Sequence, residues 1–450
     1  MGAFPDSSYI GDTLIRNIES AVNGRRFSLA MFVCVLGFVL FKRFYRDLGD
    51  VFFFFVVIGT LFSIYYNVRT VRRDPIVIAF FISLIIPILS WINSTIQIPE
   101  LAKASPSPFF FYNFFFFWFI AYWTQGKNER IAAILFAYCL SVLGIYIGHS
   151  TNFFGELIHG LHGGRIDFGV VNAQHTSLFS GFGLISAVFL FLVKTELTFK
   201  LEIVKKAIAT ALTAFFVLIV VVTQSRQVWL ALIACLFLTP LAYTAISRSQ
   251  TSKRTIFISY AVFALMILAA SSLDIVNKRL AAEKSTLTKI VNLEFNSVPD
   301  TTSIGVRIHL WLEGWEWIKQ RPILGSGEDA RELVISESDN LPEFVRADFT
   351  HLHNSHIETI LSFGVVGAAL VYFVIIWPPM FTTMSSAPPT KKIWKAFSLI
   401  IPIFWLTVNF FESYFYAANG LYIFSVFFGI IYSFRFASTE SVNCMIQKKS

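Results

Sequence analysis

The 450-residue chain contains little charge. Asp, Glu, Lys and Arg together make up 14% of it, whereas hydrophobic residues make up 55% and 51 residues are phenylalanine. Soluble domains carry about 25% charged residues, so the low charge argues against a soluble protein. The apolar residues form long runs, and runs of about 20 residues are typical of membrane spans. The composition therefore predicts an all-α polytopic integral membrane protein.

Twelve apolar runs stand out along the chain, and we predict a transmembrane helix at each. The first run follows 26 mixed polar residues and does not resemble a cleaved signal peptide, so we expect it to be retained. The predicted spans cover approximately residues 27–41, 51–67, 75–95, 108–125, 130–149, 175–193, 205–224, 227–247, 255–272, 356–378, 393–412 and 415–434.

Cysteine is scarce as well. Cys34, Cys139 and Cys235 fall inside predicted spans, and Cys444 falls in the C-terminal tail. No predicted external loop contains a cysteine, so no disulfide framework is expected. The chain also lacks an internal repeat and a matching pair of Gly- or Pro-interrupted spans, the pattern that indicates a transporter's substrate site.

Lysine and arginine are distributed unevenly among the short loops. With twelve spans and a cytoplasmic N-terminus, most of them lie on the cytoplasmic side, as the positive-inside rule requires. Both termini are therefore predicted to be cytoplasmic, and the net charge of +8 is explained without nucleic-acid binding. The opposite short loops hold only Lys42, Arg43, Arg46, Lys103, Arg165 and Arg226.

All eight histidines fall on or next to the external side in this orientation, which predicts that the working face is external. The predicted organisation is a bundle of nine spans over residues 1–272, an external loop subdomain over 273–355, three spans over 356–434 and a cytoplasmic tail over 435–450. The histidines are His149, His159, His162, His175, His309, His351, His353 and His356.

The loop subdomain contains an amphipathic segment, "VRIHLWLEGWEWIKQ", at residues 306–320. Trp311, Trp315 and Ile318 recur at helical spacing, which predicts a helix with one apolar face. The following "RPILGSGED" supplies a proline and two glycines, which predict the end of that helix.

The stretch "HLHNSHIE" places three histidines at the start of the tenth predicted span. Ser355 and Glu358 fit an S-x-x-E capping box, which predicts that the span begins near His356. His353 and Asn354 then lie just before a helix N-terminus, whose partial positive charge favours anions and a neutral imidazole. A neutral imidazole beside an anion suits a general base.

Two other interpretations of this stretch remain open. Interfacial histidines and capping residues are common in structural roles. A zinc site is the second alternative, but His351, His353 and His356 lack the i, i+4 spacing of H-E-x-x-H, and no carboxylate–histidine cluster elsewhere clearly completes a set. We therefore predict no metal.

Gly364 and Gly367, one turn apart, are predicted to let another helix pack closely.

Three arginines on the predicted external side could bind a diphosphate without a metal, because guanidinium groups grip phosphate bidentately. Arg226, in "VVTQSRQVWLALIA", lies in a short hairpin near membrane depth, where an unpaired arginine is costly. Arg307 begins the amphipathic segment, and Arg165 lies in "HGGRIDFG". Each also has a structural explanation, as a snorkelling side chain for Arg226 and a solvated or ion-paired one for the others.

At these positions the sequence resembles the O-antigen ligase and polymerase superfamily of bacterial envelope glycosyltransferases. "HNSHIETILSFGVVG" is similar to the ligase pattern of His, then Asn, Ser or Gln, nine residues and G-x-x-G. His353, Asn354, Gly364 and Gly367 occupy the pattern positions.

Three further segments carry the resemblance. "TQSRQVWLAL" looks like the family's S-R-x-x-W/L stretch, which assigns Arg226, and "GVRIHLWLEGWEWIKQRPILGSG" resembles its Arg–helix segment of the large periplasmic loop, which assigns Arg307. "RIDFGVVNAQHTSLFSGFG" is a looser match that places Arg165, with His175 and Thr176 near the family's usual proline and asparagine.

The resemblance implies a GT-C-like hexosyltransferase of lipopolysaccharide biosynthesis in the bacterial inner membrane. It implies metal-independent, inverting transfer of a glycan from undecaprenyl diphosphate to a sugar hydroxyl of lipid A–core at the periplasmic face, with no cofactor. His353 would be the general base, and Arg226 and Arg307 would stabilise the leaving diphosphate. Arg165, Asn354, His351 and His356 would contact the diphosphate or the acceptor.

Three alternatives remain. An O-antigen polymerase would use the same donor with a second lipid-linked glycan as acceptor, and a protein O-oligosaccharyltransferase is a further relative. A lipid-linked oligosaccharide transporter is the alternative from another class. A transporter should place ionisable residues along a path at mid-membrane depth, but the predicted spans have few except at their ends, with Glu412 as the main borderline case.

Overall fold

The computed structural model describes residues 19–22, 24–66, 71, 73–247, 301–384 and 392–437, with scattered positions between 260 and 299. The described residues form helices and connecting loops and contain no strand, which fits the predicted all-α class. Most of the predicted ninth span at 255–272 and most of the 435–450 tail lie outside the described residues.

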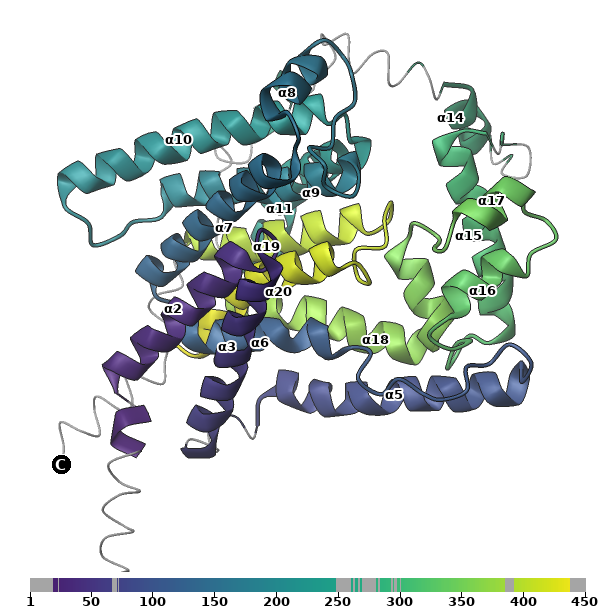
Figure 1. Ribbon diagram of the computed structural model, residues 1–450, viewed down its shortest axis with the longest axis horizontal. Helices are drawn as coiled ribbons and strands as arrows, with labels where there is room; N and C mark the ends of the chain where they lie inside the picture. Colours follow the sequence, from purple (N-terminus) through teal and green to yellow (C-terminus); the bar gives the residue numbers. More distant parts are fainter. Residues whose placement is uncertain are drawn as a thin grey trace, which may run out of the picture.

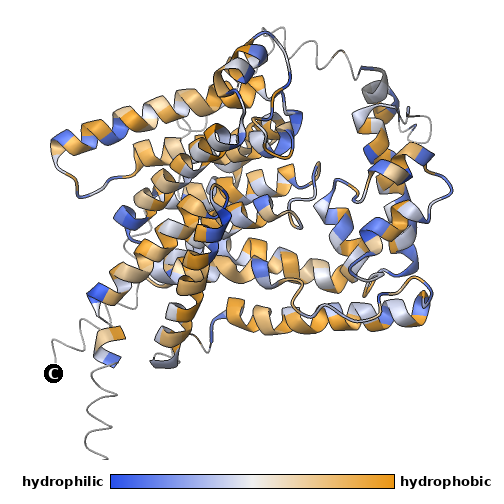
Figure 2. Cartoon of the chain, in the orientation of Figure 1, coloured by the Kyte–Doolittle hydropathy of each residue, from blue (hydrophilic) through white to orange (hydrophobic). Residues whose placement is uncertain are grey.

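Seven described helices are long and apolar enough to cross a membrane, which fits a multi-pass membrane protein. Each coincides with a predicted span. Figure 2 shows that these helices are hydrophobic over most of their length. They are α3 (Arg46–Tyr66), α5 (Pro75–Gln97), α7 (Asn128–His149), α9 (Ala173–Leu192), α10 (Phe199–Val222), α11 (Arg226–Ser247) and α18 (Ser355–Met384).

Four other predicted spans coincide with shorter helices, so the count of twelve stays a prediction. These are α2 (Arg25–Phe41), α6 (Phe116–Thr124) after the 3₁₀ turn η1 (Tyr112–Phe115), α19 (Lys392–Val408), and α20 (Ala418–Tyr432) with the turn η3 (Ser433–Arg435). Helix α19 packs against the long helix α11 and α2 packs against the long helix α3, whereas α20 packs against α6. The shared core is rich in aromatic side chains, including buried Phe117, Phe182 and Trp405.

A second group of helices lies at one end of α18 (Figure 1). It comprises α15 (Ser303–Gln320), α16 (Ala330–Ser336) and α17 (Glu343–Asp348), and we call residues 301–354 the α15–α17 segment. Its own hydrophobic cluster includes Leu310, Val334 and Leu352. Two further short helices are α8 (Phe153–Leu161) and α14 (Lys284–Val291).

Helix α15 confirms the predicted helix at 306–320 and ends before the proline- and glycine-containing stretch, as expected. Its apolar face is only partly as predicted. Ile318 is buried and Trp311 donates its indole N–H to Leu352 O at 2.9 Å, but 51% of Trp315 is exposed. Trp315 lies on the outer face because the segment packs against α18 on the other side.

Helix α18 is interrupted at Gly364, which has φ 63° and ψ −167°. At this break the loop after α15 lies against α18, and Val365 N donates to Pro322 O at 2.9 Å while Gly327 N donates to Ser362 O at 3.0 Å. A Cβ at Gly364 would lie 2.1 Å from Ile323 O. Gly364 therefore admits a loop rather than the predicted helix, because only glycine fits this backbone and this contact.

Helix α5 packs beside α18 near Gly367 (Figure 1), but a Cβ there would lie at an ordinary contact distance of 3.6 Å from Ile86 of α5. The same Cβ would lie 2.2 Å from Phe363 Cβ of α18 itself, so the close contact at Gly367 is within α18 and not with the neighbouring helix. From the same helix α5, Ser90 Oγ donates to Ser362 O at 2.6 Å, which satisfies a carbonyl group freed by the break. Backbone groups exposed by a broken span need such partners, because hydrocarbon offers none.

Candidate active site

Helix α18 begins at Ser355, and its N-cap is Asn354. The Asn354 side-chain oxygen accepts hydrogen bonds from His356 N at 3.0 Å and Ile357 N at 3.1 Å. The predicted capping box is therefore wrong, because the helix starts one residue earlier than the pattern requires. Ser355 lies within the first turn, and its Oγ donates to Asn409 Oδ1 at 2.6 Å in the loop after α19.

Glu358 ties two loops together instead of completing a capping box. It is fully buried, and its Oε1 accepts from Leu352 N at 2.8 Å and from Ser413 Oγ at 2.5 Å. Arg331 NH1 of α16 lies 3.9 Å from Glu358 Oε2. The loop that carries the histidines is thereby fixed against the loop between α19 and α20.

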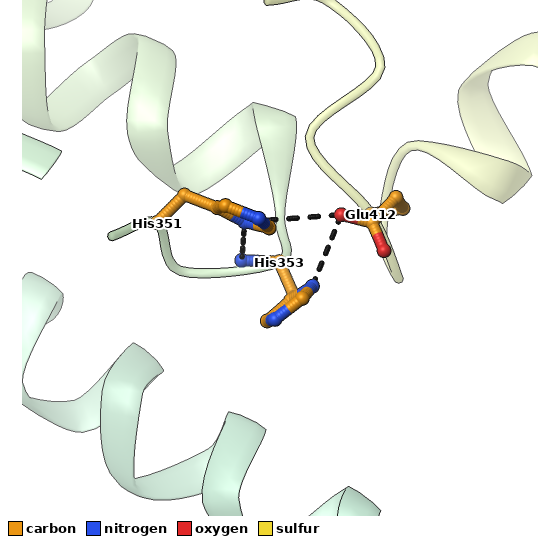
Figure 3. A group of neighbouring side chains, drawn as sticks. All are labelled: His351, His353 and Glu412. Carbon is orange, nitrogen blue, oxygen red and sulfur yellow. Dashed lines mark hydrogen bonds and ion pairs between the residues drawn. The ribbon is translucent and has the colours of Figure 1, made fainter. Parts of the chain in front are cut away.

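His351, His353 and Glu412 converge where these two loops meet (Figure 3). His353 Nδ1 lies 3.0 Å from Glu412 Oε1, and His351 Nδ1 lies 3.8 Å from the same oxygen. The backbone of His353 has φ 52°, a conformation that is uncommon among non-glycine residues. In Figure 3 one ring nitrogen of His353 faces Glu412, and the rest of the ring points away from the carboxylate.

Glu412 is the residue of this cluster to which the sequence analysis gave no role. The eleventh predicted span extends to residue 412, but α19 ends at Val408, so Glu412 lies in a loop. Burial raises the pKa of its carboxyl, but the hydrogen bond from His353 and the nearby charges of His353 and His351 outweigh burial and lower this pKa to about 2. Glu412 is therefore ionised at neutral pH.

The His351 imidazole has a strongly lowered pKa. Burial, with a smaller contribution from His353, lowers its pKa to about 4, although Glu412 acts in the opposite direction. His351 is therefore neutral at neutral pH. The backbone N–H of His353 donates to His351 Nδ1 at 3.3 Å, so that nitrogen carries no proton.

Gln174 of α9 connects this cluster to Arg307. With its amide oxygen toward the guanidinium, Gln174 accepts from Arg307 NH2 at 2.7 Å and its nitrogen donates to Glu412 Oε2. This orientation satisfies both neighbours, which the reverse cannot do. Arg307 NH1 also donates to Ser303 Oγ at 2.9 Å within α15. The structure thus brings Arg307 next to the His353–Glu412 pair.

The segments that carry Arg226 and Arg165 adjoin the same loops. Next to Arg226, Gln227 Nε2 donates to Tyr414 OH at 2.5 Å, two residues beyond Glu412. Tyr414 OH in turn donates to the backbone oxygen of Gln174 at 3.2 Å. Gln224, in the same hairpin, donates to Gly163 O at 2.9 Å and Gly164 O at 3.2 Å, directly before the exposed Arg165.

His356 and Asn354 are used structurally, which argues against their predicted contact with substrate. His356 is 6% exposed, and its Nε2 donates to Leu406 O at 3.0 Å while its Nδ1 accepts from Tyr372 OH at 2.6 Å. Both ring nitrogens are therefore occupied inside the bundle. Asn354 is 2% exposed, and its side-chain oxygen caps α18.

The two histidines and Glu412 also satisfy the geometric requirement for a metal site. Their three ligand atoms lie within 4.8 Å of one another. The expectation that no carboxylate completes a histidine set is therefore wrong, because Glu412 completes it from 59 residues away. The expectation that the reaction uses no metal stays a prediction.

Comparison with known proteins identifies one family. Residues 208–372 match the family described as O-antigen ligase, whose members are glycosyltransferase-like enzymes of lipopolysaccharide and glycan assembly. The matched segment contains Arg226, Arg307, His351 and His353, whereas Glu412 lies beyond it. No curated protein matches the chain. Over residues 208–372, the match supports the family resemblance that the sequence motifs indicated.

Proposed function

We propose that this protein transfers a glycan from undecaprenyl diphosphate to a sugar hydroxyl of lipid A–core. The match of residues 208–372 to the O-antigen ligase family supports this proposal. The transfer is metal-independent and inverting, and it takes place at the periplasmic face of the bacterial inner membrane. The observation that carries this proposal is the His353–Glu412 pair with Arg307 one residue away through Gln174.

His353 is the general base in this proposal. Its Nδ1–H donates to the ionised Glu412, which leaves the lone pair on Nε2 to take a proton from the acceptor hydroxyl. Glu412 holds this tautomer and stabilises the imidazolium that forms, as the carboxylate does in a Ser-His-Asp triad. The backbone of His353 is held at φ 52°, which supports a fixed direction for the ring.

The arginines stabilise the charge that develops on the leaving diphosphate. Arg307 is the best supported, because its contact with Gln174 places it beside the base. Arg226 and Arg165 lie on segments that contact each other and the Tyr414 loop. Guanidinium groups that donate hydrogen bonds to the oxygens of the leaving diphosphate stabilise its negative charge. In other reactions with a phosphate leaving group, a divalent cation provides this stabilisation.

An apolar cleft of about 620 Å³ between α3, α5 and the η1–α6 segment supports a hydrocarbon-chain substrate. Its lining includes Phe53, Phe80 and Tyr112. The adjacent Phe110 packs against Phe363 and Tyr416, with ring centroids 4.9 and 5.7 Å apart, and Tyr416 supports Arg331 at 4.9 Å. We assign the cleft to the lipid tail of a substrate.

A deletion strain tests the proposed acceptor. Loss of a ligase leaves polymerised glycan on its lipid carrier, whereas loss of a polymerase leaves single repeat units attached to the core. We expect the first result, with restoration by the intact chain but not by the His353→Ala variant. Single repeats on the core would instead assign the chain as a polymerase, and normal lipopolysaccharide would exclude both.

A further inference from the structure

We propose that His351, His353 and Glu412 form an inhibitory site for a zinc-class divalent cation. The site goes beyond the proposed transfer reaction, which needs no metal. Binding of the ion rests only on the geometry of the three side chains, whereas its inhibitory effect rests on the proposed role of His353 as the base.

The distances among the three side chains suit a small tetrahedral ion. His353 Nδ1 and His351 Nδ1 lie 3.0 and 3.8 Å from Glu412 Oε1, and the full set of ligand atoms falls within 4.8 Å. Ligand atoms around tetrahedral zinc lie about 3.3 Å apart, given bond lengths of about 2.0–2.1 Å. Changes of up to about 1.5 Å in these separations therefore convert the cluster into a three-ligand site.

The charges in the cluster favour a cation between the side chains. His351 Nδ1 carries a lone pair, because the backbone N–H of His353 donates to it, and this lone pair lies 3.8 Å from the carboxylate oxygen. Two electron-rich atoms thus face each other without a hydrogen bond between them. Arg307 opposes a cation, but Gln174 separates its guanidinium from the Glu412 carboxylate.

Surrounding groups already hold the ligands in place. Ser413 N donates to Glu412 Oε1 at 3.1 Å, and Gln174 holds the other carboxylate oxygen. Ser413 Oγ lies 3.0 Å from His351 Nδ1 and 2.5 Å from Glu358 Oε1, so its hydroxyl can donate to Glu358 while His351 binds the ion. Such outer contacts orient metal ligands and strengthen binding. Two imidazoles and one carboxylate favour zinc over magnesium or calcium.

Metal binding would inactivate the base by changing its tautomer. In the free site the proton of neutral His353 is on Nδ1, and Nε2 carries the reactive lone pair. When Nδ1 forms a bond to the ion, that proton moves to Nε2, with no net release. Nε2 then cannot accept a proton from the acceptor hydroxyl, so the bound ion inhibits the reaction.

Binding is tested with the purified full-length protein in detergent and no glycan substrate. We expect one Zn²⁺ per chain after gel filtration, and a visible absorption spectrum of tetrahedral Co²⁺ that Zn²⁺ abolishes. His351→Ala and Glu412→Gln should each weaken Zn²⁺ binding by at least about 10- to 100-fold, since each removes a direct ligand. His162→Ala is the matched control, because His162 is exposed and lies outside the cluster.

The variants are compared only where their gel-filtration elution volumes and thermal midpoints match those of the intact chain. If His351→Ala does not meet this criterion, the comparison uses Glu412→Gln, which preserves the shape of the side chain. Absence of stoichiometric Zn²⁺, or equal binding by the intact chain and both cluster variants, would overturn the inference.

Inhibition is measured separately as glycan transfer with and without micromolar Zn²⁺, followed by excess EDTA. We expect loss of transfer with Zn²⁺ and recovery with EDTA. Stoichiometric binding without inhibition would overturn the inhibitory role. A chain that binds Zn²⁺ at this cluster but transfers no glycan under any condition would instead overturn the proposed function and leave the metal site standing.

Discussion

The long helices and the α15–α17 segment have separate hydrophobic clusters of different character. The first is large and aromatic, with side chains such as Phe117 and Trp405, whereas the second is small and mainly aliphatic, with Leu310 and Val334. His351 and His353 lie at the C-terminal end of the α15–α17 segment, and Glu412 belongs to a loop of the first region. Neither region contains the cluster alone, so the candidate site depends on how the two are joined.

The largest expected effect comes from removing one reactive group from each side of this junction. We expect His353→Ala to reduce glycan transfer about 10²- to 10⁴-fold and Arg226→Ala about 10²- to 10³-fold, through loss of the base and of a diphosphate contact. Capping of lipid A–core in cells and the amount of protein in the membrane are measured together. Normal glycosylated lipopolysaccharide from either variant at unchanged protein level would contradict the assigned role.

Arg307 of α15 connects the two regions through its contact with Gln174 of α9. Two substitutions separate the contribution of its positive charge from that of its planar guanidinium group. We expect Arg307→Ala to lower transfer about 10²- to 10³-fold. Arg307→Lys should recover only part of this loss, because lysine cannot grip both Gln174 and a phosphate with one planar group. The measurement is kcat/KM with purified donor and acceptor. Full activity of the lysine variant would show that charge alone suffices.

A substitution at Gly364 tests the contact between α18 and the loop after α15 through the stability of the protein and not through its activity. We expect Gly364→Ala to cost more than about 2 kcal/mol, because a positive φ disfavours alanine and its Cβ would lie 2.1 Å from Ile323 O. Gly163→Ala is the matched control, since its φ is also positive, at 92°, but a Cβ there has open space. Thermal midpoints in detergent compare the two, and equal losses would mean that the loop contact contributes nothing.

Glu412→Gln should have a smaller effect, because the imidazole remains. The ionised carboxylate holds the proton of His353 on Nδ1 and stabilises the imidazolium that forms during the reaction. We expect the maximal rate of the Glu412→Gln variant to fall about tenfold. Because the pKa of the Glu412 carboxyl is about 2, the carboxylate is present throughout the neutral and mildly acidic range, so the loss should be similar at every pH in that range. The measurement is the rate of transfer as a function of pH, and an unchanged rate would argue against the pairing.

The smallest expected effect is that of chelation. Transfer by the purified enzyme should not fall in excess EDTA, because arginines supply the positive charge at the diphosphate. Activity is assayed before and after chelation, and magnesium, manganese and zinc are then added back singly. A loss that one of these ions restores would replace the arginine-based mechanism with a metal-dependent one.

The elements near the site differed in how far the sequence could predict them. The long apolar runs and the helix α15 were predictable, because hydrophobic length and helical spacing are local signals. His353 could be chosen for a similar reason, as an ionisable residue at the start of an apolar run, and Arg307 could be chosen because it begins the amphipathic segment and fits the family's Arg–helix pattern. Glu412 and Gln174 could not, because their roles come from contacts with partners 59 and more than 100 residues away.

The misread details at the start of α18 have one physical cause. Both Asn354 and Ser355 are good N-cap residues, and the three-residue spacing to Glu358 favoured Ser355. The structure uses Asn354, because Ser355 and Glu358 are engaged by Asn409 and Ser413 of a distant loop. Tertiary contacts therefore decided between two locally acceptable helix starts.

The break at Gly364 constrains the order in which the protein can be assembled. The carbonyl groups of Leu361 and Ser362 are satisfied by residues 326 and 327 and by Ser90, all of which precede α18 in the chain. A ribosome therefore delivers every partner of these two carbonyl groups before the helix itself. Circular permutation that places residues 321–327 after α18 would reverse this sequence and leave the nascent helix with unmet backbone groups in the bilayer.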